Sequence, residues 1–215
     1  MRLIRPFLLV VLVLGLIFAV RMVNQDQASR PVVLTHDVAQ IQSALAGAHW
    51  VSPGVTTPGS QRALYMVSFR TCPYCRLFED TQFARLQKAG IDTRLIMVAR
   101  RDRDGEARST PVERATVAEL WRARDWGLYQ RWAAATPELW ETTAKLPEAD
   151  ADPARAAQVE AARATVDHLS DLLAENGVDL AYPALIWQGS DGRWRAYIGY
   201  DPKAADRIRA DLGAA

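Results

Sequence analysis

The stretch ALYMVSFRTCPYC, residues 63–75, decides the fold of this chain. Its apolar part, residues 63–69, predicts a buried strand, and a helix-compatible stretch follows at residues 76–88. A strand, a short turn and a helix in this order place Cys72 at the N-terminus of a helix. Cys72 and Cys75 are the only two cysteines of the chain. This pair is therefore the first candidate for chemistry.

The position of the two thiols predicts a redox pair. At a helix N-terminus the unpaired backbone N–H groups and the helix dipole favour a thiolate, so we expect the pKa of Cys72 to lie below the free value of about 8.5. Cys72 is then the nucleophile, and Cys75, one turn further along, resolves the mixed disulfide. Pro73 suits the first helical position, where its missing N–H costs nothing. A disulfide across so small a loop restrains little unfolded-chain entropy, which disfavours a purely structural role.

A zinc half-site is the main alternative for a pair of cysteines. Zinc needs two further ligands, and the three histidines, His36, His49 and His168, are scattered along the sequence. We therefore expect no metal and no cofactor.

Composition bounds the class of protein. The chain has 215 residues, 49% of them hydrophobic, and a formal net charge of +1. It can bury one good core and lacks the excess of positive charge that is typical of nucleic-acid binding. Nucleic acid is therefore not an expected partner.

The N-terminal segment is predicted to be an export signal or a membrane anchor. Arg2 and Arg5 precede an apolar run at residues 7–20. Cleavage after Ala19 or Ala28 fails the small-residue rule, since Ile17 and Asp26 then occupy the third-last position.

We therefore expect an uncleaved signal-anchor helix at residues 1–23 in the inner membrane, with the remainder in the periplasm. A soluble periplasmic protein, released by signal cleavage, is the alternative. The compartment is in either case oxidising, which suits a reactive dithiol without spare thiols.

The rest of the chain divides into a linker and one domain. Residues 24–49 are expected to form a linker and a short helix capped by Thr35 or Asp37. Residues 50–215 are expected to form an α/β domain, in which a second strand at 91–98 lies parallel to the first strand in a right-handed βαβ unit.

A helical insertion at about residues 111–176 is expected to interrupt this domain, after a strongly charged segment at residues 100–108. That segment either guides a partner or, more simply, forms a solvated loop. The tryptophans of the insertion either line a substrate groove or belong to the core. A hairpin at 184–188 and 194–198 and a final helix opened by Pro202 complete the pattern.

Several of these segments together resemble the thioredoxin-fold disulfide isomerases of the bacterial periplasm, the DsbC/DsbG family. The resemblance covers roughly residue 50 to the C-terminus. It rests on Thr71 through Cys75 with Pro73 and Tyr74, on Tyr182-Pro183-Ala184 entering a strand, and on Gly199-Tyr200 followed by Pro202-Lys203. It implies a thioredoxin-like fold and a cis peptide bond between Tyr182 and Pro183 that faces the sulfurs. The backbone at Tyr182 and Pro183 would then hold an extended substrate in β-like pairing.

The chain also departs from the family in two places. Met66 stands six residues before the first cysteine, where thioredoxins and related oxidases often carry a buried carboxylate that assists proton transfer. The family's isomerases also have an N-terminal dimerisation domain, for which residues 24–49 are too short. Proton transfer is therefore expected to use water or another group. Without a dimerisation domain, the sequence supports thiol–disulfide exchange more directly than isomerase activity.

The sequence thus predicts a membrane-anchored periplasmic thiol:disulfide oxidoreductase, either a reductase or an isomerase. Its expected partners are exported proteins with cysteines and a membrane redox partner that recycles the dithiol. A glutaredoxin-like, glutathione-dependent reductase and a tethered, non-enzymatic chaperone or assembly factor are the alternatives.

Overall fold

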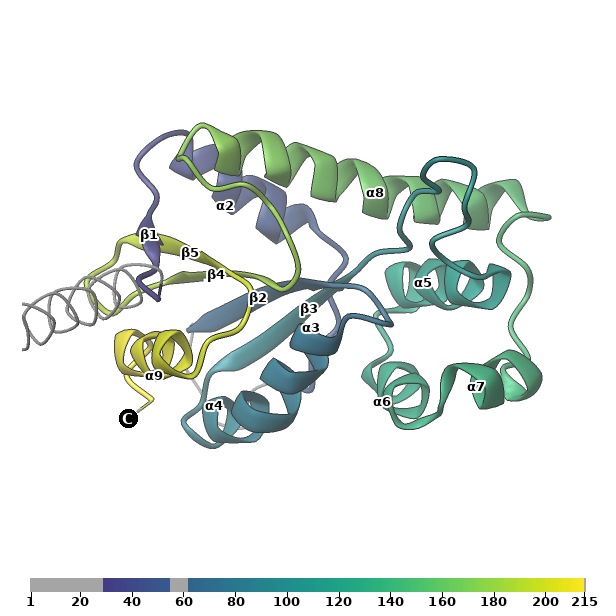
Figure 1. Ribbon diagram of the computed structural model, residues 1–215, viewed down its shortest axis with the longest axis horizontal. Coiled ribbons are helices and arrows are strands. Elements are labelled where there is room, and N and C mark those ends of the chain that lie inside the picture. The colour runs from purple at the N-terminus through teal and green to yellow at the C-terminus, as the bar shows by residue number, and fades with distance from the viewer. Residues whose placement is uncertain (1–28, 55–61, 215) are drawn as a thin grey trace, which may run out of the picture.

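The computed structural model describes residues 29–54 and 62–214. The anchor expected at residues 1–23 lies outside the described residues, as does the start of the expected linker. Within the described ranges, no helix combines the length and the apolar character that crossing a bilayer requires. The described residues form one five-stranded sheet with helices on both faces (Figure 1).

The sheet is mixed, with the strand order β1-β5-β4-β2-β3. β2 and β3 are parallel, whereas the other neighbours are antiparallel. The parallel pair confirms the predicted strand–helix–strand unit, and the hairpin β4–β5 has the predicted bounds. The strands are Val32–Val33 (β1), Ala63–Ser68 (β2), Asp92–Met97 (β3), Ala184–Gln188 (β4) and Trp194–Ile198 (β5).

β2 lies inside the sheet, between β4 and β3. All of its residues from Leu64 to Ser68 are buried. Helices cover both faces of the sheet, so this strand is a continuous apolar run rather than an alternating one. Its C-terminal end leads directly into the turn before Cys72.

The helices form two layers and a separate group at one end of the sheet. Figure 1 shows α2 and α8 on one face and α3, α4 and α9 on the other, with α5, α6 and α7 beyond the end of the sheet. The helices are Val38–Gly47 (α2), Pro73–Phe78 (α3), Ala84–Lys88 (α4), Pro111–Ala123 (α5), Trp126–Ala134 (α6), Pro137–Thr143 (α7), Pro153–Ala174 (α8) and Pro202–Asp211 (α9). A π-helical turn, η1 (Glu79–Phe83), joins α3 to α4.

The four helices α5 to α8 lie between β3 and β4, as the predicted helical insertion requires. Proline at the first helical position and a capping side chain start three of them, α5, α7 and α8. The mixed sheet, with helices on both faces and α5 to α8 inserted between β3 and β4, makes this a thioredoxin-like α/β fold with a helical insertion.

The tryptophans of the insertion belong mainly to its core. Trp121 Nε1 donates to the carbonyl oxygen of Met97 at 2.7 Å, and Trp140 Nε1 donates to Thr116 Oγ1 at 2.9 Å. These bonds satisfy the polar edges of both rings inside the protein. Trp121, Trp132 and Trp140 are all buried, so the core interpretation is correct for these three side chains and the substrate-groove interpretation is not.

The described part before residue 50 is attached to the domain. β1 pairs with β5 at the edge of the sheet, and Ile41 and Leu45 of α2 are fully buried. The expected cap is absent, because Asp37 has a left-handed backbone and no capping side-chain bond. Asn176 Oδ1 instead accepts hydrogen bonds from the backbone N–H groups of Thr35 and His36, at 2.7 and 2.9 Å.

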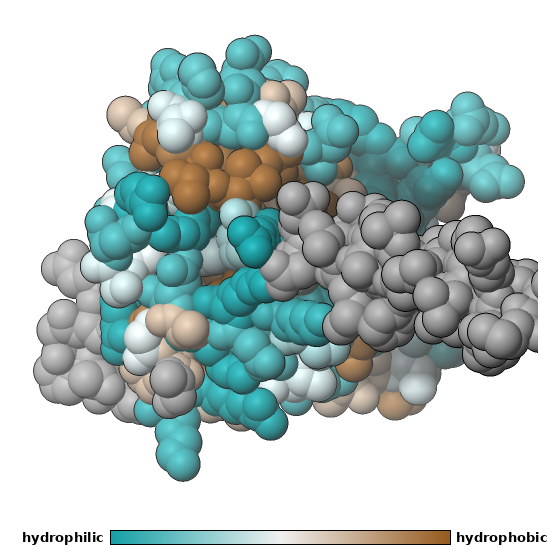
Figure 2. Space-filling model, turned by 60° about the vertical axis from the view of Figure 1, so that its left-hand side comes forward, coloured by the Kyte–Doolittle hydropathy of each residue, from teal (hydrophilic) through white to brown (hydrophobic). Residues whose placement is uncertain are grey.

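Figure 2 shows the side of the molecule that lies to the left in Figure 1. Hydrophilic residues cover most of the described surface in this view, and the hydrophobic residues gather chiefly in one patch near the top. Among the described residues, four large hydrophobic side chains are exposed: Val32, Tyr74, Leu77 and Leu139. Tyr74 and Leu77 belong to α3, the helix that carries the cysteine pair.

Candidate active site

Cys72 is the N-cap residue of α3, as the sequence predicts. Its Sγ accepts a hydrogen bond from the backbone N–H of Cys75 at 3.1 Å, and its own N–H donates to the carbonyl oxygen of Phe69 at 3.2 Å. Pro73 occupies the first turn of the helix, where no N–H is needed. A backbone donor and the positive end of α3 therefore act on the same sulfur, and both stabilise a negative charge on it.

Cys72 and Cys75 form a disulfide in this structure, with 5.3 Å between their Cα atoms. Both residues are buried, Cys72 with 2% and Cys75 with 0% of its surface exposed. Cys72 is thus the slightly less buried residue of the pair. The structure thus represents the oxidised form of the pair.

The residues around the pair form an exposed rim. Thr71 and Pro73 are exposed, and Tyr74 is 57% and Leu77 is 42% exposed. Aromatic and aliphatic side chains on the surface of an otherwise polar helix are suited to contact with apolar segments of another polypeptide.

The fold brings Tyr182 and Pro183 to this end of the sheet. Ala184, the first residue of β4, pairs with Val67 of β2, so Pro183 lies next to the point where β2 ends. The Tyr182–Pro183 peptide bond is cis, as the resemblance implies. The ring of Tyr182 packs edge-to-face against Phe69, with 5.0 Å between the ring centroids.

The backbone of Tyr182 is available for pairing. Pro183 O accepts from Gly199 N at 2.8 Å, which anchors the loop to the end of β5. Within residues 29–54 and 62–214, however, neither the N–H nor the C=O of Tyr182 has a hydrogen-bonding partner. An extended segment that lies beside Tyr182 can therefore form backbone hydrogen bonds there.

A buried carboxylate that sequence reasoning missed lies one turn after the cysteines. Met66 is fully buried and offers no group for proton transfer. Glu79 does carry a carboxyl, and its backbone N–H donates to Cys75 O, so it lies one helical turn after Cys75. Residues four apart share a helix face, so Glu79 lies on the same side of the helix as Cys75. Its spacing from Cys75 was the available signal, since nothing in the sequence showed that Glu79 is buried.

Burial raises the pKa of Glu79 from its ordinary value of 4.5 to about 7, although the hydrogen bond from the Tyr129 hydroxyl and the charge of Arg76 act in the opposite direction. Arg76 Nη1 lies 3.6 Å from Glu79 Oε2. Tyr129 comes from α6 of the insertion, and burial is likewise the largest cause that raises its pKa. A carboxyl with this pKa exchanges protons near neutral pH, as a general acid or base must.

Arg100 also reaches the site from a distant part of the sequence. Its guanidinium carbon lies 3.9 Å from the ring centroid of Phe69, and its Nη2 lies 3.4 Å from Thr71 Oγ1. It thus contacts both the turn before Cys72 and the aromatic ring that packs on Tyr182. Arg100 begins the charged segment at residues 100–108, of which residues 101–107 are exposed.

Of the three histidines, His49 packs against the protein interior and His168 lies at the surface. His49 stacks on Trp121, with 5.3 Å between ring centroids, and His168 is exposed on α8. Among the residues that the structure describes, no three His, Cys, Asp or Glu side chains are grouped so that they could hold a metal ion.

Comparisons with known proteins agree with the fold. No protein-family model and no curated protein matches the chain. The thiol-disulfide exchange protein alpha-DsbA2 of Wolbachia pipientis is 12% identical, with a TM-score of 0.50 over 82% of this chain and 92% of that one. BcfH of Salmonella enterica Typhimurium is 17% identical, with a TM-score of 0.50 over 98% of this chain and 89% of that one. A periplasmic thioredoxin-like protein of Salmonella enterica serovar Typhimurium is 18% identical, with a TM-score of 0.48 over 81% of this chain and 94% of that one. At these identities the likeness to alpha-DsbA2 and to BcfH shows the fold alone.

Proposed function

We propose that this protein is a thiol:disulfide oxidoreductase that acts on exported proteins. The observation that carries the proposal is the position of the Cys72–Cys75 pair, at the N-terminus of α3. The unpaired backbone of Tyr182 and the exposed side chains of Tyr74 and Leu77 add a surface for an unfolded polypeptide. The fold shared with alpha-DsbA2, a thiol-disulfide exchange protein, supports the same function.

The reductive half of the reaction follows from the positions of the two sulfurs. The Cys72 thiolate attacks one sulfur of a substrate disulfide, so that the substrate S–S bond breaks, a Cys72–substrate disulfide forms and one substrate thiolate leaves. Cys75 then loses its proton and attacks Cys72 Sγ, which forms the Cys72–Cys75 disulfide and releases the second substrate thiolate. Two electrons pass from the protein to the substrate, and the reverse sequence oxidises a substrate dithiol.

Glu79 is our candidate for the group that accepts the proton of Cys75. It shares a helix face with Cys75, and its carboxyl is poised to ionise near pH 7. Glu79 would thereby assist proton transfer, which the Met66 side chain cannot do. The Tyr129 hydroxyl, which donates to Glu79, holds the carboxyl in place.

The setting of the reaction is the periplasmic side of the inner membrane. The basic and apolar residues at positions 1–23 support an anchor, and release by signal cleavage gives a soluble form of the same enzyme. A membrane redox partner would return the pair to its active state. Reduction and isomerisation both start from the reduced pair, and the resemblance of the sequence to the DsbC/DsbG family supports these two reactions.

Replacement of Cys75 by alanine tests the proposal. The Cys75→Ala variant lacks the resolving thiol, so exported proteins should accumulate as mixed disulfides on Cys72, visible as adducts that disappear on reduction. The Cys72→Ala/Cys75→Ala double variant is the matched control and should form none. If the single variant forms no adducts under export conditions, the proposed function is wrong.

A further inference from the structure

A groove of about 680 Å³ opens beside Thr71, immediately before the cysteine pair. The end of the charged loop, the start of α5 and part of α7 form its walls. We call it the Thr71 groove, and its polar lining residues include Thr71, Arg100, Arg108, Ser109, Glu113 and Glu141. Thr71 is the neighbour of Cys72, so the groove begins one residue before the cysteine pair.

Two arginines line the groove, and the guanidinium of Arg100 stands at the end nearest to the cysteines. Arg100 Nη2 lies 3.4 Å from Thr71 Oγ1 and donates to Arg108 O at 3.0 Å. The contact of Arg100 with Phe69 holds its charge against the turn that leads to Cys72. Arg108 follows along the same wall.

These two charges lack the ion pairs that most arginines of the described chain have. Arg101, for example, contacts Glu160 and Asp167, and Arg114 contacts Asp150. Among the described residues, no carboxylate lies within ion-pairing distance of Arg100 or Arg108. The Nε atoms of both are buried without a hydrogen-bond acceptor.

The acidic residues of the groove do not neutralise this end. Glu113 Oε2 accepts a hydrogen bond from Thr110 N in the capping box of α5, and its position is fixed there. Glu141 is exposed on α7, on the wall formed by the insertion. Asp102 in the loop accepts a hydrogen bond from the backbone N–H of Arg108 at 3.3 Å, but it does not line the groove and forms no ion pair with either guanidinium. The groove lining beside Thr71 is thus positive, whereas the acidic side chains of the lining belong to α5 and α7.

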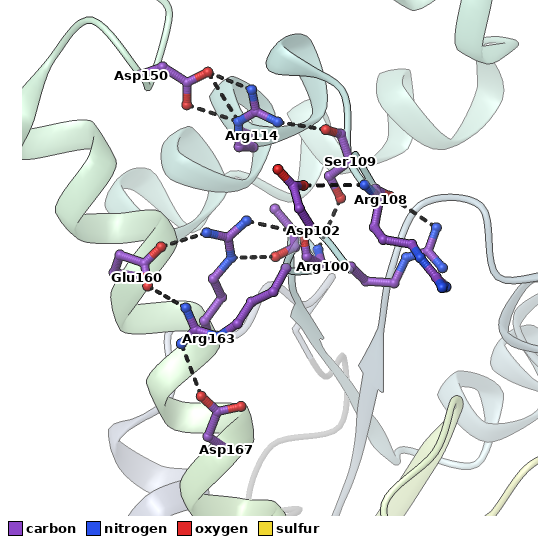
Figure 3. A network of polar contacts seen from close by, with 11 residues as sticks. Arg100, Asp102, Arg108, Ser109, Arg114, Asp150, Glu160, Arg163 and Asp167 are labelled. Carbon is purple, nitrogen blue, oxygen red and sulfur yellow. Dashed lines mark hydrogen bonds and ion pairs between the residues drawn. The ribbon is translucent and has the colours of Figure 1, made fainter. Parts of the chain in front are cut away.

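The loop that carries the two arginines is held firmly. Arg163 of α8 donates to Ala99 O at 2.8 Å and to Arg100 O at 3.1 Å. Arg114 of α5 donates to Ser109 O at 2.6 Å. Figure 3 shows this network, in which the loop lies between α8 and α5. The backbone that carries the two charges is therefore held in place before a ligand arrives, which lowers the cost of ordering it on binding.

We propose that the Thr71 groove is a subsite for the substrate polypeptide and that it selects segments with a carboxylate beside the reacting cysteine. The inference rests on the proposed function and names the class of substrate for the same site. Fixed positive charges beside the nucleophile attract an acidic segment and reject a basic one, which acts on specificity and on the rate of encounter. Arg100 and Arg108 supply the recognition, and Cys72 supplies the chemistry.

Peptides with one activated cysteine test the subsite. The probe is a peptide whose cysteine forms a mixed disulfide with thionitrobenzoate, with Glu, Gln or Lys on either side of that cysteine. The reduced, full-length protein in detergent attacks the peptide sulfur through Cys72. A Cys72–peptide disulfide forms, and the low-pKa thionitrobenzoate leaves as a coloured thiolate. Its release gives the second-order rate constant for each peptide.

We expect the Glu peptide to react about threefold to tenfold faster than the Gln peptide at low salt, as partly exposed ion pairs allow, and the Lys peptide to react more slowly. This ratio should approach one in 1 M salt, where the Debye length is about 3 Å. Arg100→Gln and Arg108→Gln should each lower the ratio. Arg103→Gln, in the same loop with a side chain that is 74% exposed, is the matched control and should leave the ratio unchanged.

The ratio separates recognition from reactivity. A change in the thiolate of Cys72 alters the rates of all peptides together, so it leaves the Glu-to-Gln ratio unaltered. Equal rates for the three peptides with the wild-type protein would overturn the subsite and leave thiol–disulfide exchange standing. Failure of every peptide to release thionitrobenzoate would overturn the proposed function and the subsite together. The salt series on the wild-type protein needs no variant, so a misfolded variant does not affect the decision.

Discussion

Glu79 should make the stability of the oxidised protein depend on pH. Its side chain is only 9% exposed, and burial raises its pKa from 4.5 to about 7. Between these two pH values the folded chain keeps a proton that the unfolded chain has lost. The free energy of unfolding therefore falls as pH rises through this interval, and the loss is complete above about pH 7.

The size of the effect follows from the shift. Each pKa unit corresponds to about 1.4 kcal/mol, so the shift of Glu79 corresponds to about 3 kcal/mol. Glu79→Gln removes the titration and keeps an oxygen that can accept the hydrogen bond of Tyr129. The free energy of unfolding of Glu79→Gln minus that of the wild-type protein should therefore be about 3 kcal/mol larger at pH 8 than at pH 4.

Urea unfolding of both proteins at several pH values between 4 and 8 measures this difference. The oxidised form is used, because the Cys72–Cys75 pair does not titrate in it. Glu148→Gln, at an exposed site between α7 and α8, is the matched control and should show no pH-dependent difference beyond a few tenths of a kcal/mol. A difference between Glu79→Gln and wild type that stays constant from pH 4 to pH 8 would refute the reasoning.

Two further predictions concern the core and the nucleophile. Trp140→Phe removes the hydrogen bond to Thr116 Oγ1 from a buried site, so its free energy of unfolding should fall by about 1–3 kcal/mol in denaturant titrations, whereas Leu139→Ala at the exposed neighbouring position should cost much less. In the reduced protein, alkylation of Cys72 should reach its half-maximal rate below about pH 8.5, and a midpoint at or above that of a free thiol would contradict stabilisation by the N-terminus of α3.

The elements with strong local patterns were predictable from the sequence. β4 and β5 have the expected bounds because their apolar runs flank a Gly-Ser-Asp-Gly turn at residues 189–192. Cys72 lies at the N-terminus of a helix as predicted, since an apolar strand and a proline define both sides of it. The position and helical nature of the insertion also followed from apolar residues at helical spacing.

Features that depend on tertiary contacts were not predictable. The two residues of β1, both valines, favour a strand but form too short a run to predict one, and they pair with the edge of β5 only in the folded chain. Asp37 does not cap α2, because its backbone is left-handed. The N–H groups of Thr35 and His36 just before it bond to Asn176, which is 140 residues away from His36. Glu79 is buried because the insertion places Tyr129 against it.

The arginines of the charged segment illustrate the same limit within the site. Residues 101–107 are exposed, as expected of a solvated loop. Arg100 differs because α8 holds its carbonyl oxygen and Phe69 holds its guanidinium, and both contacts come from other parts of the chain. Composition alone shows a run of mixed charges there, so the unpaired charges near Thr71 emerge only from the fold.

Transfer of electrons between the Cys72–Cys75 pair and a polypeptide is the central claim, and thiol counting tests it most directly. The oxidised full-length protein is mixed with a reduced, unfolded cysteine-containing protein, and the reduced protein with the corresponding disulfide form. Acid quenching and alkylation then count the thiols on each partner. We expect thiols lost by one partner to equal those gained by the other, with no such transfer in the Cys72→Ser variant. A pair that keeps its redox state in both mixtures would contradict the claim.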